Sequence, residues 1–202
     1  MNRLVQILIG AMLAGIFTNA SAAVITSLPG GVALPIPSTN QLGFSGPATV
    51  APGVTFSSTQ PSAYGYTGGY GFASNGSWSG APMIGLDRGT GYFDLTFTNH
   101  LSAFLGELNW TTWNAGNASI SIYDSANNLL ESLLLENGAN IVAPGFYGFS
   151  RASADIAKVR FSEEYIGVRN ITTLSAVPEP ASLALLGLGL VGLMQVRRRK
   201  SV

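Results

Sequence analysis

The sequence predicts an all-β protein, an antiparallel β-sandwich with a leader before it and a short apolar segment after it. From Val54 onward, short runs of alternating apolar and polar residues are broken by Gly, Asn or Asp about every ten residues, which is typical of sandwiches. The chain of 202 residues has no cysteine, so its stability must come from a buried core. The body between the end segments, about 155 residues, is long enough to form one.

Residues 1–22 have the pattern of a secretory signal peptide, which implies export through the Sec machinery. Arg3 precedes an apolar stretch over Leu4–Phe17. This stretch, about fourteen residues, suits a signal peptide better than the alternative, a retained membrane helix. We expect cleavage after Ala22 or Ala23, within a cleavage region of small residues that contains Ala20, Ala22 and Ala23.

Residues 23–52 are expected to form a lead-in segment with one strand at most. Pro, Gly, Ser and Thr stand where a strand would need apolar periodicity, and five prolines interrupt the segment: Pro29, Pro35, Pro37, Pro47 and Pro52. The β-sandwich domain is therefore expected over residues 53–174.

The clearest predicted strand covers Tyr92–Thr98, in which Phe93, Leu95 and Phe97 face one side and polar residues face the other. Residues 104–110 repeat the pattern, with Phe104, Leu108 and Trp110 on one side. Asn99-His100 lies between the two runs, so the sequence predicts a hairpin that turns there.

A second hairpin is predicted over residues 119–136. Ile120 and Ile122 face inward, and Asn127-Asn128 tolerates the positive φ that a tight turn needs. Asn137-Gly138 supplies the next turn. Three closing strands are then predicted over residues 145–150, 156–162 and 165–174.

The charge of the body argues against nucleic-acid binding. The chain has ten basic and ten acidic residues; five of the basic ones lie in the end segments (Arg3, Arg197, Arg198, Arg199 and Lys200), as does the acidic Glu179. Five basic and nine acidic side chains remain, a net charge of about −4. Phosphate binding needs clustered cations, and only Lys158 and Arg160 lie close together.

The residue types exclude much chemistry, and no catalytic or metal-binding residue is predicted. Without cysteine there is no thiolate nucleophile, and His100 alone cannot form a site that needs two imidazoles. Asp94 and Glu107 are carboxylates that the fold could still bring together. A structural calcium ion is an open possibility, with candidate ligands in turns, Asp87, Asp124 and Asn127, but their spacing is not specific.

Aromatic residues give the best indication of binding. Residues 64–72 alternate rings with glycine, so Tyr64, Tyr66 and Tyr70 could stand on one face and stack against sugar rings. The same pattern also fits rings that pack into the core of a glycine-rich sheet, and this second interpretation is favoured. Trp78, Trp110 and Trp113 are interpreted in the same way.

Residues 175–202 form a distinct C-terminal segment. Val177-Pro178-Glu179-Pro180 is followed by an apolar run, Ala181–Val196, and by a basic cluster, Arg197, Arg198, Arg199 and Lys200. As a helix the run would be about 24 Å long, against a hydrocarbon core of roughly 30 Å, so it predicts a short transmembrane helix that anchors weakly or transiently. The cations would stop translocation and remain cytoplasmic.

This order of motifs resembles the PEP-CTERM sorting signal of Gram-negative bacteria. The resemblance implies an exported protein whose precursor is anchored in the inner membrane and cut near the Pro-Glu-Pro element by an exosortase, a membrane-embedded cysteine enzyme. An ordinary single-span tail is the alternative, but it needs no Pro-Glu-Pro. Segments of the body, among them residues 123–130, 145–150 and 167–172, resemble the jelly-roll-like sandwiches found with such signals.

Two functions are consistent with these features. The first is a structural or adhesive protein at the cell surface or in the extracellular biofilm matrix. The second is a carbohydrate-binding module that retains the cell's own exopolysaccharide. An enzyme is not expected.

Overall fold

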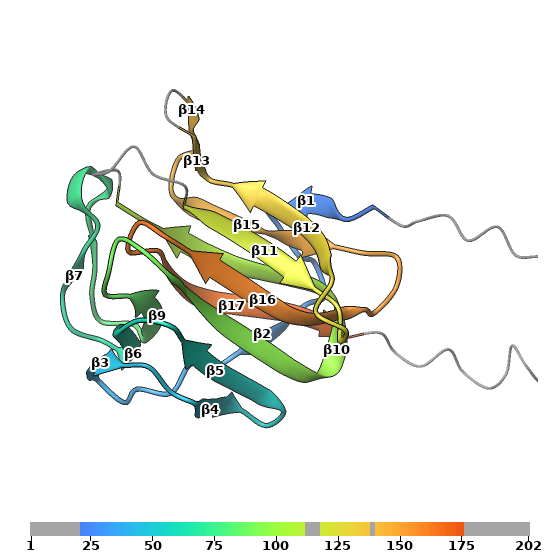
Figure 1. The fold of residues 1–202 in the computed structure, drawn as a ribbon, viewed down its shortest axis with the longest axis horizontal. Helices are drawn as coiled ribbons and strands as arrows, with labels where there is room; N and C mark the ends of the chain where they lie inside the picture. The colour runs from blue at the N-terminus through green and yellow to red at the C-terminus, as the bar shows by residue number, and fades with distance from the viewer. Residues whose placement is uncertain (1–20, 112–117, 138–139, 176–202) are drawn as a thin grey trace, which may run out of the picture.

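The computed structural model describes residues 21–111, 118–137 and 140–175, and these are nearly all antiparallel β (Figure 1). The strands are β1 Ala23–Ile25, β2 Val32–Leu34, β3 Gln41–Phe44, β4 Ala48–Ala51, β5 Val54–Ser58, β6 Ser62–Tyr66, β7 Tyr70–Gly71, β8 Ser77–Trp78, β9 Met83–Leu86, β10 Tyr92–Asn109, β11 Ser119–Tyr123, β12 Leu129–Leu134, β13 Glu136–Asn137, β14 Asn140–Ile141, β15 Gly145–Ser150, β16 Ile156–Ser162 and β17 Gly167–Ser175, with one 3₁₀ turn, η1 Ala73–Asn75. No helix in these described ranges is long and apolar enough to span a membrane.

One long strand, β10, organises the molecule. Its first part pairs with β5 and β16, and its second part pairs with β15 and β17. The pairing with β16 is irregular between Thr96 and Leu101, where the strand passes from one set of partners to the other. The predicted hairpin at Asn99-His100 is therefore wrong. The chain does turn back in this region, because Gly89 and Thr111, just outside the two ends of β10, both hydrogen-bond to Glu164. The two halves of β10, however, pair with different strands and not with each other.

The pairings form one 13-stranded sheet, which bends at β10 into two parts, sheet I and sheet II, consistent with the predicted β-sandwich. Sheet I has the strand order β12-β11-β16-β10-β5-β4. Sheet II has the order β1-β15-β10-β17-β9-β6-β3, and β2 pairs with another part of β17. All of these pairs are antiparallel.

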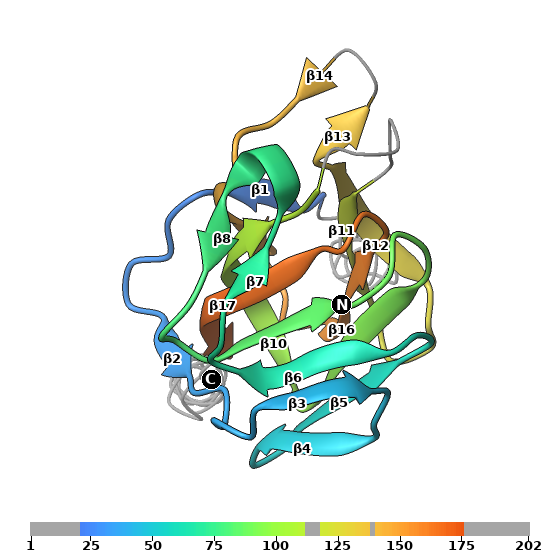
Figure 2. The same ribbon diagram turned by 90° about the vertical axis from the view of Figure 1, so that its left-hand side faces the viewer.

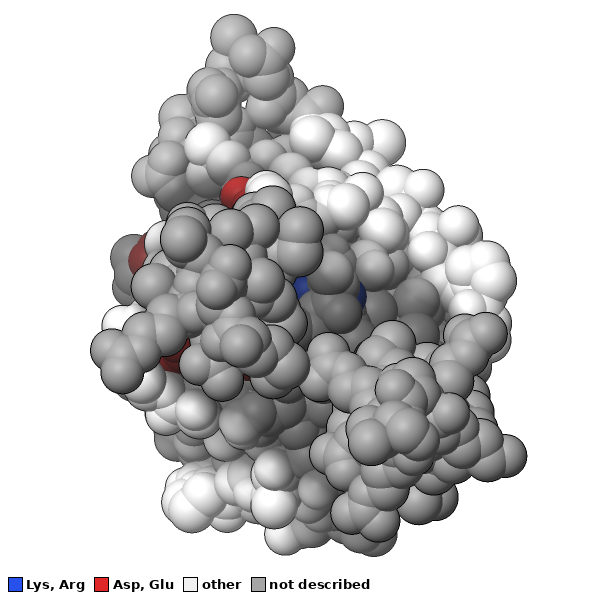
Figure 3. Space-filling model, turned by 90° about the vertical axis from the view of Figure 1, so that its right-hand side faces the viewer, with Lys and Arg blue, Asp and Glu red and all other residues white. Residues whose placement is uncertain are grey.

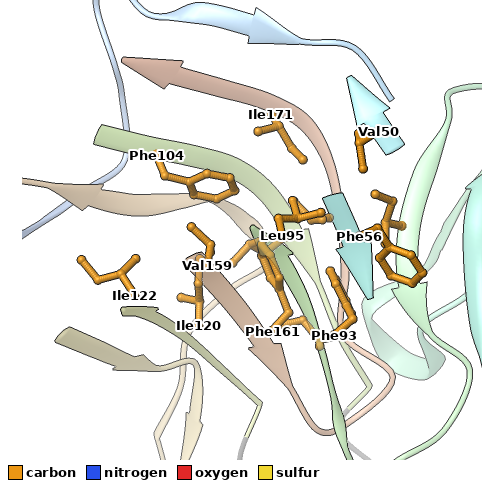
Figure 4. Packing of buried hydrophobic residues seen from close by; sticks show 14 of the residues in the cluster. Val50, Phe56, Phe93, Leu95, Phe104, Ile120, Ile122, Val159, Phe161 and Ile171 are labelled. Carbon is orange, nitrogen blue, oxygen red and sulfur yellow. The ribbon is translucent and has the colours of Figure 1, made fainter. Parts of the chain in front are cut away.

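The main core lies between the sheets (Figure 4). The inward residues predicted on the first part of β10, Phe93 and Leu95, are fully buried, as are Ile120 and Ile122 of β11. The ring of Phe161 stacks on Phe93, with ring centroids 4.6 Å apart. Aromatic contacts of this kind add to the area that each ring buries, so the middle of the core is held by rings from neighbouring strands.

The segment expected to be a lead-in is part of the fold. Residues 23–52 contain four strands, β1 to β4, instead of one at most. Each has only three or four residues, and most of those residues are exposed. Strands that short with little burial have no apolar alternation to reveal them, which is why the sequence pattern missed them.

The second hairpin matches its prediction. β11 pairs with β12, and Asn127 has the expected positive φ of 66°. The Asp124 carboxylate fixes the turn because its Oδ1 accepts a hydrogen bond from the Asn128 amide at 2.8 Å. The closing strands β15 and β16 also have the predicted bounds, whereas Gly138 of the next turn lies outside the described residues.

A small hairpin, β7 with β8, covers part of the outer face of sheet II (Figure 2). Gly85 and Gly167 pair across β9 and β17. Their inward neighbours, Ile84 and Val168, are in the main core, so the glycines face outward. A Cβ on Gly167 would lie 2.9 Å from Cζ of Phe72, so the missing side chain lets that ring rest on the sheet. Phe72 belongs to a second apolar cluster with Ala63, Tyr70, Trp78 and Met83.

Candidate functional site

The predicted sorting residues lie immediately after the described fold. The last strand, β17, ends at Ser175. Val177, Pro178, Glu179 and Pro180, and the cations Arg197, Arg198, Arg199 and Lys200, lie outside the described residues, as do Ala20 and Trp113. At the other end, Ala22 packs against the main core and Ala23 opens β1.

The two ends of the described chain lie at the same end of sheet II. Ala23 pairs with Ser150, Ser150 with Ala103, and Ala103 with Leu174. These four residues form one row across four neighbouring strands, so Ala23 and Leu174 are three interstrand spacings, about 14 Å, apart. The chain enters the sandwich through β1 and leaves it through β17 at this end, which we call the termini end (Figure 1).

The Tyr/Gly segment does not form the stacking face that was considered for sugars. Tyr64 is 3% exposed in the main core, where its ring stacks on Phe56 at 5.1 Å. Tyr70 is 8% exposed in the second cluster, and its hydroxyl donates a hydrogen bond of 2.5 Å to the Leu86 carbonyl. Burial raises the pKa of Tyr70. Tyr66 is half-buried, with its ring edge-on to Tyr70. Packing accounts for these rings.

The glycines of this segment serve the backbone. Gly65 has a φ of 57°, and a Cβ there would lie 1.9 Å from the carbonyl oxygen of Pro37. Only glycine fits so close an approach in this conformation. Glycine between the tyrosines therefore brings the lead-in strands against β6, and it does not clear a surface for a ligand.

The outer face of sheet I carries a polar cluster that sequence analysis did not single out. Asp94 and Arg160 pair directly across β10 and β16, and two parallel hydrogen bonds of 2.8 and 2.9 Å join the guanidinium to the carboxylate. Lys158 lies 3.9 Å from the same carboxylate. Hydrogen bonding and charge from Asp94 raise the pKa of Arg160. The fork geometry makes this pair stronger than an ordinary surface ion pair.

Two tyrosines flank these cations. The Arg160 guanidinium lies 3.4 Å from the ring centroid of Tyr92 and 5.2 Å from that of Tyr123. The Lys158 ammonium lies 4.5 Å from the Tyr123 ring. We call Tyr92, Asp94, Tyr123, Lys158 and Arg160 the sheet I cluster. The alternation of polar residues on β10 and β16 could have indicated a polar face on each strand. The sequence did not reveal the register between the strands, which brings these residues into one cluster.

The outer face of sheet II carries a similar ion pair. Arg169 donates two hydrogen bonds of 2.8 Å to the Glu107 carboxylate, and the Asn170 amide donates a third, of 2.7 Å. Hydrogen bonding from Arg169 holds the pKa of Glu107 below its usual value. The guanidinium also lies 4.3 Å from the Trp78 ring, so it joins the small hairpin to the sheet.

The carboxylates considered for catalysis are not brought together. Asp94 and Glu107 lie on different parts of β10, in different sheets, and each is bound by its own arginine. His100 is part of β10, at the bend between its two halves. The described residues include no group of three or more His, Asp or Glu that could hold a metal ion.

The calcium ligands considered from sequence are also divided. Asp124 and Asn127 share the β11–β12 turn, but the Lys158 ammonium donates a hydrogen bond to the Asn127 Oδ1. A cation thus already occupies that oxygen. Asp87 follows β9 and lines a different hollow, of about 290 Å³, with Tyr70, Thr111 and Tyr165.

The comparison with protein families finds a match at the C-terminal end of the chain. Residues 176–200 match the PEP-CTERM protein-sorting motif. No curated protein is detectably similar to the chain. The match covers the segment in which the Pro-Glu-Pro element, the apolar run and the basic cluster follow one another directly after β17. The chain is accordingly an exported protein that carries a PEP-CTERM sorting signal, the substrate signal of an exosortase.

Proposed function

We propose that the mature protein has a structural or adhesive role at the cell surface or in the extracellular matrix, and that it is not an enzyme. The single observation that carries this proposal is the outer face of sheet I. One row across this face contains Ser57, Asp94, Arg160, Ser121 and Ser132, on five neighbouring strands. Asp94 and Arg160 are paired with each other, and the Ser121 hydroxyl is buried against that of Ser132, so these residues include no free reactive group. Ser57 and Ser132 are exposed and offer their hydroxyl groups on this stable support.

The exposed residues of this face support the proposal that it is a contact surface. Thr55, Ser57 and Thr96 are exposed on its central strands. Hydroxyl side chains held in register by a sheet make repeated hydrogen bonds without a net charge, which suits adhesion to a hydrated polymer. The ion pair of Asp94 with Arg160 keeps the strands in that register.

A second function, binding of the cell's own exopolysaccharide, is favoured by Tyr92 and Tyr123 on the same face. Each ring is half-buried. Aromatic side chains beside a few hydroxyl and guanidinium donors are typical of small-ligand sites. This proposal moves the sugar site from residues 64–70 to the sheet I cluster.

Exchange of these rings tests both functions. We expect the variant Tyr92→Ser with Tyr123→Ser to be released from the matrix into the medium several-fold more than the native chain. Phe146→Ser is the matched control, because Phe146 is an aromatic residue, 42% exposed, outside this face. Unchanged retention of a folded double variant would contradict a role for the face. Affinity electrophoresis in gels with purified exopolysaccharide then separates sugar binding from adhesion to protein.

A further inference from the structure

The termini end of the sandwich lies only a few residues before the Pro-Glu-Pro element, near which the processing enzyme is expected to cut. β17 is paired up to Ser175, where it lies opposite Leu101 of β10, and the Leu174 carbonyl accepts a hydrogen bond of 3.1 Å from the Ser102 hydroxyl. Pro178 is only three residues further on. Three Cα–Cα steps reach at most about 11 Å, even when fully extended.

This reach is no greater than the thickness of one protein layer. An α-helix with its side chains is about 10–12 Å across. An enzyme that encloses Pro178-Glu179-Pro180 with even a single helix or loop on the side of the body must therefore touch the sandwich.

We propose that the termini end is a docking surface for the exosortase-like enzyme and that the enzyme accepts the sandwich already folded. The proposal rests on the sorting function, since it names where that partner meets the body. The surface consists of the Pro52-Gly53 turn, the Thr98–His100 part of β10, the Asp124–Asn128 turn and the Arg151–Asp155 loop.

Contacts between these segments place them together. The Thr98 amide donates to the Gly53 carbonyl at 2.8 Å, and the Arg151 amide donates to the Ser102 carbonyl at 2.8 Å. Since Leu101 pairs with Ser175, all of them lie around the point where the chain leaves β17.

The chemistry of this end suits contact with a protein. A hollow of about 340 Å³ lies here, lined among others by His100, Asp124 and Lys158. Arg151 forms an ion pair with Asp155, with an Nε to Oδ1 distance of 2.5 Å. Among the described residues visible in Figure 3, uncharged ones predominate on this side, with only small blue and red areas. Balanced charge and a hollow favour a specific protein contact over general attraction to an anionic bilayer.

The position of β1 makes folding before cleavage possible. Because Ala23 and Leu174 lie in one row, about 14 Å apart, a precursor held at both ends needs no long connection on either side to complete sheet II. A fold whose ends left on opposite sides would require one connection to run along the whole body.

Obstruction of this surface tests the proposal. Ala126→Trp with Ala152→Trp places two large side chains on exposed positions of the termini end. Thr90→Trp with Ala143→Trp does the same at the opposite end. Each pair is made in the full chain and again with a six-residue Gly/Ser spacer between Ser175 and Ala176. Loss of the tail with time is followed by intact mass in cells that contain the enzyme, and melting of the purified body checks the fold.

We expect the termini-end pair to slow tail removal several-fold in the chain of native length, and the spacer to restore the native rate. The opposite pair should have no effect. Native-rate processing of the obstructed chain would overturn the proposal, as would slowing that the spacer does not relieve. The same comparison with purified enzyme in detergent separates the partners: slowing that persists supports contact with the enzyme, and slowing that disappears assigns the surface to the bilayer instead. Matrix retention is a separate readout, so failure here leaves the adhesive role to its own test.

Discussion

The two outer faces of the sandwich carry the same arrangement with opposite results. On sheet I, Asp94 of β10 binds Arg160, which lies on the ring of Tyr92. On sheet II, Glu107 of the same strand binds Arg169, which lies on the ring of Trp78. Tyr92 belongs to β10 itself, so the first arrangement stays within its sheet and leaves a surface. Trp78 belongs to the β7–β8 hairpin, so the second fastens a cover onto its sheet.

The difference teaches that a charged pair on a sheet has no fixed role. What decides the role is whether the aromatic partner comes from the same sheet or from another element. The glycine pair Gly85 and Gly167 allows the cover on sheet II, because no side chain keeps Phe72 away from the backbone. At its central outward positions, sheet I has hydroxyl and ionic side chains in place of glycine, so a ring cannot rest on the backbone there.

The largest loss of stability should come from removal of the Phe72 ring, which lies between the β7–β8 hairpin and sheet II. Phe72→Ala should weaken the closing of the β7–β8 hairpin by about 3–5 kcal/mol, because a fully buried ring is lost and a cavity remains. Hydrogen exchange of the native protein should show faster exchange in residues 70–78, with little change in the first part of β10. Equal loss of protection in sheet I would mean that the two faces are not independent.

Loss of Arg169 from sheet II should lower the free energy of unfolding more than loss of Arg160 from sheet I. Arg169→Ala should lower the free energy of unfolding by about 1.5–3 kcal/mol, since hydrogen bonds to a charged group are lost and Glu107 keeps only the neutral Asn170. Arg160→Ala should cost less, because Lys158 remains 3.9 Å from Asp94. Urea unfolding of both variants at equal m-value measures the difference. A larger cost for Arg160→Ala would reverse the comparison.

Acid should weaken the cover on sheet II through Glu107. Its pKa is lower in the folded protein than its ordinary value of 4.5, chiefly because Arg169 donates hydrogen bonds to it. Its contribution to stability is therefore complete above about pH 4.5 and is lost as the pH falls through the folded-state pKa. Asp155 and Asp124 also have lowered pKa values. The measurement is thus the difference in unfolding free energy between the native chain and Glu107→Gln, which should shrink as the pH falls from 5 toward 2.

The smallest effect should come from the rings over the arginines. Tyr92→Leu should cost about 0.5–1 kcal/mol, the range for a cation–π contact at a partly exposed site. Trp78→Leu should cost more, because Trp78 also packs in the second cluster with Phe72, at 4.9 Å between ring centroids. Double-mutant cycles with Arg160→Ala and Arg169→Ala isolate each contact. A coupling of zero for Tyr92 with Arg160 would show that their close approach adds no stability.

Strand existence could be predicted where burial follows the backbone period. Phe93, Leu95, Ile120 and Ile122 face the core as the alternation indicated. At Asn99-His100 the alternation located the reversal of the chain but not its form, because two polar residues look the same in a tight hairpin turn and in a bend that joins two sheets. Leu101 decides between them, and it does so through partners far along the chain.

The candidate site was less predictable than the fold. The sorting signal could be read from the sequence because its information is linear: a motif, an apolar run and a cluster of cations in order. The sheet I cluster is assembled from β10, β11 and β16, and only their register places Arg160 between Asp94 and the two tyrosines. In residues 64–70, glycine between aromatic residues fits either an open face or a close backbone approach, and only the position of Pro37 decides.

The pairings of β10 also have a consequence for the order in which the fold can be completed. The chain is synthesised from its N-terminus, so β10 is available long before β15, β16 and β17, to which most of its length is paired. Until then its first part can pair only with β5, which precedes it, and its second part lacks the partners that β15 and β17 supply. The last of these partners, β17, directly precedes the segment that matches the sorting motif. Completion of the sandwich thus requires the whole body of the chain up to the sorting signal.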